Sequence, residues 1–263
     1  MKYAFMTFSC PDFTLTEVLA AAQRYGYDGV ELRIDANHKH EVELSNTAEQ
    51  RAAAKAKAAE YGVALCAVAT SCKFADPASA AQNVAAAHER IDLAGDLGAN
   101  VLRIFGGQIP QGVSREDAIA SVVKSLQALA DHAAQRGVYL ALETHDDWCD
   151  PRHVQAVMRQ VNQPNVGVNW DYQHTTRVAK TRVDEAFGAL SPYIRHVHFH
   201  DGTLAADKLE FLPIGQGAYD HRRVLALLKS IGYTGYLSGE WINWEPADVH
   251  LPRELQAIKQ LEG

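Results

Sequence analysis

Four short segments decide the fold of this chain: YLALE (residues 139–143), VGVNWD (166–171), RHVHFH (195–200) and YLSGE (236–240). Each is mainly apolar and ends on a side chain that can bind a metal ion. Successive side chains of a β-strand point to opposite faces. The alternation therefore predicts one face for packing and an opposite face that carries four polar residues, Glu143, Asp171, His198 and Glu240.

The rest of the chain alternates short apolar runs with longer amphipathic ones. Further strands are predicted at residues 1–8, 28–33, 63–69 and 100–105. Helices are predicted at residues 14–25, 45–61, 79–97, 114–136, 151–161, 180–190, 220–231 and 252–261. Strict alternation of strand and helix favours parallel strands joined by right-handed crossovers.

Eight such repeats in about 250 residues are typical of a (β/α)8 TIM barrel. We predict one TIM barrel domain that spans residues 1–263. The alternative is an open, doubly wound sheet, which normally has a glycine-rich phosphate loop after its first strand. The segment CPDF (residues 10–13) is not such a loop.

Composition limits the partners. The chain is 47% hydrophobic and 22% charged, and its net charge of -7 gives no general electrostatic reason to bind nucleic acid or an acidic membrane. No apolar run approaches the length of a membrane span. The four cysteines form no C-x-x-C pair. We expect a reduced, cytoplasmic protein with no nucleic-acid or membrane partner.

The active site of a TIM barrel lies at the C-terminal ends of its strands. Three carboxylates and one imidazole are predicted there, and they would repel one another if buried without a cation. Oxygen-rich sites with one nitrogen suit Mn²⁺, Co²⁺, Mg²⁺ or Fe²⁺ better than a structural zinc ion. We predict one divalent metal ion bound by Glu143, Asp171, His198 and Glu240.

Five short motifs follow one another along the chain: LETH (142–145), D-x-x-H (171–174), H-x-x-D (198–201), G-x-G-x-x-D (215–220) and GEW (239–241). In these motifs and their order the sequence resembles the xylose isomerase-like barrels of the sugar and sugar phosphate isomerases and epimerases, among them ketose 3-epimerases and inosose or hydroxypyruvate isomerase-type proteins. The resemblance implies that the four residues are the ligands of a single metal. It further implies that Glu143 and Glu240 are paired acid/base carboxylates and that His174 contacts a substrate oxygen.

This arrangement predicts a metal-dependent sugar isomerase or epimerase. A metal on the carbonyl and hydroxyl of a keto-sugar acidifies the C–H group between them and stabilises a metal-bound enediolate. Glutamates on opposite sides can then remove and return a proton. Loss of a group β to the enolate would instead make a lyase, dehydratase or hydratase of a keto-sugar, inositol or glycoside derivative. A sugar-binding protein without turnover is a third alternative, against which the intact pair Glu143 and Glu240 argues.

Further substrate contacts are predicted for five residues: His174, His200, His145, Lys208 and Arg33. The contact of His174 is implied by the resemblance, whereas His200 and His145 share the inward face of the predicted ligands. Arg33 ends the second strand facing inward, where it could equally pair with Glu31, and Lys208 could meet a phosphate or carboxylate group. His196 lies one layer deeper and is expected to be structural. No strong phosphate-binding loop is present, which favours an unphosphorylated sugar.

The nuclease branch of similar barrels, the apurinic endonucleases, has a three-metal cluster with extra histidines. The corresponding places here hold Ser71-Cys72, Phe105-Gly106 and Asp207-Lys208-Leu209. Together with the acidic chain, this predicts that DNA is not the substrate. Sister proteins often form dimers or tetramers, so a homo-oligomer is compatible with the resemblance.

Overall fold

The computed structural model describes residues 1–205 and 209–263. Eight parallel strands close into a barrel in the order β1, β10, β7, β6, β5, β4, β3, β2. The barrel strands are β1 (Lys2–Met6), β2 (Gly29–Arg33), β3 (Ala64–Lys73), β4 (Val101–Phe105), β5 (Tyr139–Glu143), β6 (Val166–Asp171), β7 (Ile194–Phe199) and β10 (Tyr236–Gly239). The predicted (β/α)8 architecture is confirmed.

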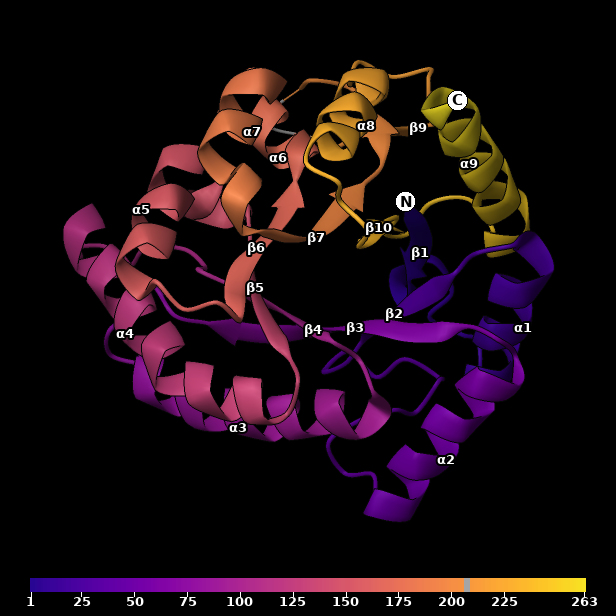
Figure 1. Cartoon of the computed structure of the whole chain (residues 1–263), viewed down its shortest axis with the longest axis horizontal. Helices are drawn as coiled ribbons and strands as arrows, with labels where there is room; N and C mark the ends of the chain where they lie inside the picture. Colours follow the sequence, from indigo (N-terminus) through magenta and orange to yellow (C-terminus); the bar gives the residue numbers. More distant parts are fainter. Residues whose placement is uncertain (206–208) are drawn as a thin grey trace.

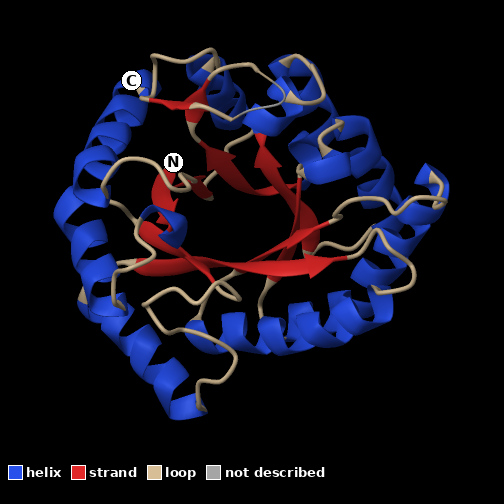
Figure 2. Ribbon diagram, turned by 180° about the vertical axis from the view of Figure 1, so that it is seen from behind, coloured by secondary structure: helices blue, strands red, loops and turns tan. Residues whose placement is uncertain are grey.

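Helices surround the strands, as Figures 1 and 2 show from opposite sides. The long ones are α1 (Leu15–Tyr25), α2 (Ala48–Glu60), α3 (Ala80–Leu97), α4 (Arg115–Gln135), α5 (Pro151–Val161), α7 (Val183–Leu190), α8 (His221–Ser230) and α9 (Ala247–Glu262). Thr14 and Thr47 form capping boxes at the starts of α1 and α2. Gly26 ends α1 with a left-handed φ of 87°, which only glycine adopts without strain.

Two features of the loops after strands were not predicted. A short helix, α6 (Tyr172–Arg177), follows β6 directly, and a small antiparallel pair, β8 (Asp201–Gly202) and β9 (Phe211–Leu212), follows β7. Single 3-10 turns lie at η1 (Thr7–Ser9), η2 (Asp146–Trp148) and η3 (Ser191–Tyr193). All of these segments lack an apolar period of their own, so local pattern does not reveal them.

The last helix also differs from expectation. It begins at Ala247 instead of Pro252, which lies inside it although proline cannot donate a backbone hydrogen bond. The turn before Pro252 is held by packing, because the ring of His250 lies 5.3 Å from that of Trp241 and 5.5 Å from that of Trp244. In the described part of the chain, no helix is both long and apolar enough to cross a membrane.

The alternation along the strands divides the core in two. Leu140 and Leu142 belong to the large cluster between strands and helices. Their neighbour Ala141 belongs to a small cluster inside the barrel, whose buried members are Ala4, Cys66, Ala67, Val101 and Ala141. Barrel interiors usually carry bulky branched side chains. The small residues at this level leave room in the barrel interior for larger polar side chains.

Candidate metal and catalytic site

The four predicted ligands meet at one point. Ligand atoms of Glu143, Asp171, His198 and Glu240 all lie within 4.8 Å of one another. Nδ1 of His198 lies 3.3 Å from Oε1 of Glu143 and 3.2 Å from Oε2 of Glu240. The side chains of Glu143 and His198 are buried, whereas that of Glu240 is 13% exposed. Solvent therefore reaches the cluster on the side of Glu240.

These residues fit a divalent cation. Within the described residues, Nδ1 of His198, Oδ2 of Asp171 and both carboxylate oxygens of Glu143 are buried and make no hydrogen bond, although His198 and Arg103 lie within ion-pair distance of Glu143. Buried polar atoms normally have partners, because an unpaired one loses its hydration without compensation. A cation would satisfy several of these lone pairs together, and three carboxylates with one imidazole suit a hard or borderline ion.

The D-x-x-H motif has a structural cause. Oδ1 of Asp171 caps α6 by accepting from the backbone N–H of His174 at 3.0 Å, while its Oδ2 is buried and has no hydrogen-bond partner among the described residues. The cap turns the chain so that Nδ1 of His174 lies 3.1 Å from the carbonyl oxygen of Thr144. Since a carbonyl only accepts, this contact places the proton of His174 on Nδ1.

Thr144 fixes the strand ends that carry two ligands. Its hydroxyl donates to the carbonyl oxygen of Asp171 and accepts from the backbone N–H of Asp171, both at 2.9 Å. Thr144 follows Glu143 directly, so the two hydrogen bonds lock the end of β5 to the end of β6. The threonine of the LETH motif thus holds the two strand ends together.

Glu143 lies against a buried arginine. Oε2 of Glu143 is 3.1 Å from Nε of Arg103, and both side chains are only 1% exposed. Arg103 also donates to the carbonyl oxygen of Thr70 at 2.9 Å. Burial alone would raise the pKa of Glu143, but His198 and Arg103 outweigh it and hold this pKa below its usual range. Glu143 is therefore a carboxylate at neutral pH.

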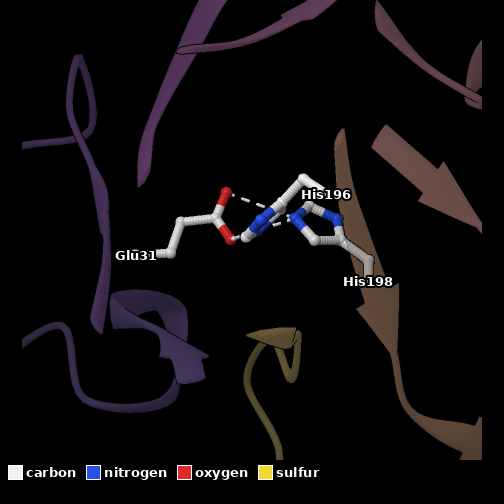
Figure 3. Close-up of side chains that lie close together, drawn as sticks. All are labelled: Glu31, His196 and His198. Carbon is white, nitrogen blue, oxygen red and sulfur yellow. Dashed lines mark hydrogen bonds and ion pairs between the residues drawn. The ribbon is translucent and has the colours of Figure 1, made fainter. Parts of the chain in front are cut away.

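A second buried cluster adjoins the first (Figure 3). Oε2 of Glu31 lies 2.9 Å from Nε2 of His196 and 3.1 Å from Nε2 of His198, and all three side chains are fully buried. Burial would raise the pKa of Glu31, but His198 and His196 reverse this and lower it well below its ordinary value. His196 is thus a partner of Glu31 deep in the barrel.

In the described part of the chain, Arg33 forms no ion pair with Glu31 or with another carboxylate of the site. Its guanidinium group donates to Oγ of Ser71 at 2.6 Å and to the carbonyl oxygen of Ala69 at 3.3 Å, so its contacts tie β2 to β3. The pairing of Glu31 with Arg33 is not formed, because Glu31 turns to the histidines of β7. A substrate role for Arg33 remains a prediction.

The two other predicted histidines, His145 and His200, pack against different rings, those of His174 and Phe211 respectively. The ring of His145 packs edge-on against that of His174 at 4.7 Å, and Nδ1 of His145 lies 3.1 Å from Oδ1 of Asp146. Burial would lower the pKa of His145, but Asp146, Glu143 and other acids raise it to about 9. His200 is 2% exposed and packs on Phe211, and burial lowers its pKa to about 4. Lys208 lies outside the described residues.

Asp201 explains the H-x-x-D and G-x-G-x-x-D motifs together. Its carboxylate accepts from the backbone N–H groups of Gly202 and Gly215 at 2.8 Å and from that of Gly217 at 3.0 Å. A Cβ atom on Gly217 would lie 2.0 Å from Oδ1 of Asp201, so only glycine fits there. The glycine motif therefore folds the loop after β7 back onto the end of that strand.

Sequence reasoning underestimated three residues that contact the ligands: Glu31, Arg103 and Asn169. Nδ2 of Asn169 lies 3.1 Å from Nε2 of His198. Strand alternation already placed each of them on the inward face. It could not tell which side chains meet across the barrel, because that depends on strand order and register.

Comparison with known proteins supports the family resemblance seen in the sequence motifs. A family model described as "Xylose isomerase-like TIM barrel" matches residues 19–262. The chain is 26% identical over 259 residues to an L-ribulose 3-epimerase of Methylomonas sp. (strain DH-1), and the match covers 93% of this chain and 84% of that protein. It is 25% identical over 169 residues to a 2-oxo-tetronate isomerase of Haemophilus influenzae, with coverage of 59% and 61%. In two other curated relatives the match spans little more than half of their length, 58% and 54%.

The structure agrees with this result. A crystal structure of D-allulose 3-epimerase from Methylomonas sp., in complex with D-allulose, superposes with a TM-score of 0.78 at 22% identity, covering 99% of this chain and 96% of the other. At this identity the superposition supports the fold. The family model, by contrast, spans nearly all of the sequence, including every strand that carries a candidate ligand. This chain belongs to the xylose isomerase-like TIM barrel family.

Proposed function

We propose that this protein is a divalent-metal-dependent sugar isomerase or epimerase that moves a proton at a carbon next to a carbonyl group. The placement of Glu143 and Glu240 carries the proposal. In the barrel, β7 and β6 lie between β10 and β5, so the two glutamates approach the site from opposite sides of Asp171 and His198. Opposed carboxylates suit the removal of a proton from one face of a substrate and its return on the other.

Glu143, Asp171, His198 and Glu240 would hold the ion, each offering a ligand atom to the same point. When bound, a divalent ion would polarise the substrate carbonyl and stabilise the negative charge of the enediolate. The relatives named above include a ketose 3-epimerase and an oxo-acid isomerase. Both activities act on a carbon beside a carbonyl group, which supports this reaction class.

The two glutamates transfer protons, and His174 contacts the substrate. One glutamate removes the proton from the carbon α to the carbonyl. The glutamate on the opposite side, in its protonated form, returns a proton to the same carbon, which inverts it. Return to the adjacent, former carbonyl carbon interconverts ketose and aldose, with the hydroxyl proton of the first carbon passing to the former carbonyl oxygen. His174 is protonated on Nδ1 by its contact with Thr144, so its Nε2 offers a lone pair to a substrate hydroxyl group.

We favour an unphosphorylated sugar. Arg103 is used by Glu143 and Thr70, and Arg33 is used by Ala69 and Ser71. Both guanidinium groups are thus already engaged by protein acceptors. The three carboxylates of the site add negative charge, which would repel a phosphate placed beside them.

Deuterium exchange tests the proposal. Protein loaded with Mn²⁺ is incubated in D₂O with a panel of ketohexoses and keto-sugar derivatives, beside the variants Glu143→Gln and Glu240→Gln. The control is Glu262→Gln, since Glu262 is a 19% exposed carboxylate paired with the amino group of Met1 at the opposite end of β1. We expect deuterium in the product with the control and none with either site variant.

The labelled product identifies the reaction. Deuterium on an inverted carbon indicates an epimerase, and deuterium beside a relocated carbonyl group indicates an isomerase. Deuterium with loss of water or another β group would support the lyase, dehydratase or hydratase alternative. If the metal binds but no substrate exchanges or reacts, proton transfer is rejected and a sugar-binding protein remains.

A further inference from the structure

We infer that Glu31 is a positioning residue of the metal site, which holds His198 with its Nδ1 atom turned toward the other three ligands. The inference rests on the proposed function, because it assigns a task within the proposed metal centre. It is carried by the cluster of Glu31, His196 and His198 in Figure 3, which shares His198 with the cluster of candidate ligands.

The two nitrogens of the His198 ring have opposite surroundings. Nε2 lies 3.2 Å from Oε1 and 3.1 Å from Oε2 of Glu31. Nδ1 lies 3.3 Å from Glu143 and 3.2 Å from Glu240. His198 thus forms the link between the two clusters, with one nitrogen in each.

Glu31 decides which nitrogen carries the proton. An ionised carboxylate only accepts hydrogen bonds, so a neutral His198 that contacts it donates from Nε2 and keeps its lone pair on Nδ1. Asn169 also approaches Nε2, but an amide can offer either its oxygen or its nitrogen and does not select a tautomer. Carboxylates that accept from the second nitrogen of a metal-binding histidine orient the ring and raise its basicity.

His196 holds Glu31 in place for this task. Its Nε2 donates to the same Oε2 atom at 2.9 Å, and β2 and β7 lie across the barrel from each other with β1 and β10 between them. A fully buried carboxylate is costly unless it is hydrogen-bonded. Hydrogen bonds from the two imidazole groups compensate for its lost hydration and hold the Glu31 carboxylate directed at β7.

The test compares Glu31→Gln, His196→Leu and the control Glu262→Gln. Calorimetric titration with Mn²⁺ measures affinity and stoichiometry. We expect one ion per chain, a loss of affinity of roughly 10- to 100-fold in Glu31→Gln, a smaller loss in His196→Leu, and no change in Glu262→Gln.

Imidazole nitrogen NMR gives a second readout that does not depend on turnover. In protein loaded with diamagnetic Zn²⁺, His198 is expected to show a hydrogen-bonded N–H at Nε2 and no proton on Nδ1. Glu31→Gln should shift this N–H signal, because an amide replaces the carboxylate acceptor. A merely structural role of Glu31 would change the unfolding temperature without moving this signal.

The outcomes are distinct. Equal Mn²⁺ affinity and an unmoved His198 signal in folded Glu31→Gln would overturn the role of Glu31 and leave the proposed function intact. Absence of Mn²⁺ binding by the unmodified protein would refute both. Two ions per chain would mean that Glu31 is itself a ligand, which also overturns the inference. If Glu31→Gln does not fold, a proton on Nδ1 of His198 in the Zn²⁺-loaded unmodified protein decides against it.

Discussion

Replacing Arg103 with methionine should strongly destabilise the metal-free protein. The substitution keeps much of the side-chain stem and removes the charge that faces Glu143 at 3.1 Å, where both side chains are 1% exposed. Two unit charges at that distance attract by about 5 kcal/mol at an effective dielectric constant near 20. Removing one partner of a buried ion pair costs about 3 to 5 kcal/mol, because the other charge stays buried without that partner; here, among the described residues, Glu143 would keep only His198 as an ion-pair partner.

Scanning calorimetry at neutral pH measures the loss. Each kcal/mol shifts the unfolding temperature of a chain of this size by roughly 2 to 4 °C, so Arg103→Met should unfold roughly 6 to 20 °C lower. The matched control is Arg223→Met, whose ion pair with Asp184 has side chains 48% and 43% exposed. Solvent screens such an exposed pair, so Arg223→Met should unfold close to the temperature of the unmodified protein.

Two further comparisons isolate the mechanism. Glu143→Gln in the Arg103→Met background should recover most of the lost stability, because an amide carries no unpaired charge. His198 and Arg103 together hold the pKa of Glu143 below its usual value. The stabilisation that comes from Arg103 is therefore present at neutral pH and is lost as the pH falls through the acidic range, so Arg103→Met should lose less stability on acidification than the unmodified protein. The reasoning is refuted if Arg103→Met unfolds at the temperature of Arg223→Met, or if the double variant is less stable than Arg103→Met alone.

Three other predictions concern the frame around the site. His40 has its pKa lowered to about 4 by burial, and since the unfolded chain binds the proton near pH 6.5, acidification from pH 7 to 5 should cost about 2 kcal/mol through this group. Urea unfolding of His40→Gln at both pH values should show that much less pH dependence, and an unchanged dependence would contradict it. Trp148 is fully buried and donates to the carbonyl oxygen of Gly107 at 2.8 Å, so Trp148→Ala should cost about 3 to 5 kcal/mol of unfolding free energy; a loss under 1 kcal/mol in urea unfolding would show that the packing is not as described. Asp201→Asn removes a charged acceptor of three backbone N–H groups and should lower the unfolding free energy by about 1.5 to 3 kcal/mol, the contribution of a hydrogen bond to a charged group; an unfolding free energy equal to that of the unmodified protein would rule this out.

The fold and the set of candidate ligands follow from short-range pattern. The alternation of Leu140, Ala141, Leu142 and Glu143 between two faces depends only on strand geometry, and the two core clusters confirm it. Once the strands are parallel and closed, their inward polar ends must meet. Threonine caps and glycines mark helix ends through local interactions. The helix predicted at residues 14–25 is observed as α1, with Thr14 as its N-cap and Gly26 as its C-cap.

The partners of the ligands depend on long-range geometry. Glu31 and His198 are 167 positions apart and come from strands that are not neighbours, so strand alternation gives their direction but not their contact. Helix α6 was missed because it has six residues and is started by a side-chain cap from Asp171. The pairing of β8 with β9 depends on backbone hydrogen bonds between two-residue strands, which carry no apolar pattern.

The most direct test of the account is anomalous diffraction from crystals soaked in Mn²⁺. We predict a single strong peak within bonding distance of Nδ1 of His198 and of carboxylate oxygens of Glu143, Asp171 and Glu240, with Nε2 of His198 still bound to Glu31. No peak at this position, or a peak bonded to Nε2 of His198, would contradict the proposed metal site and the acid/base roles assigned to the two glutamates beside it.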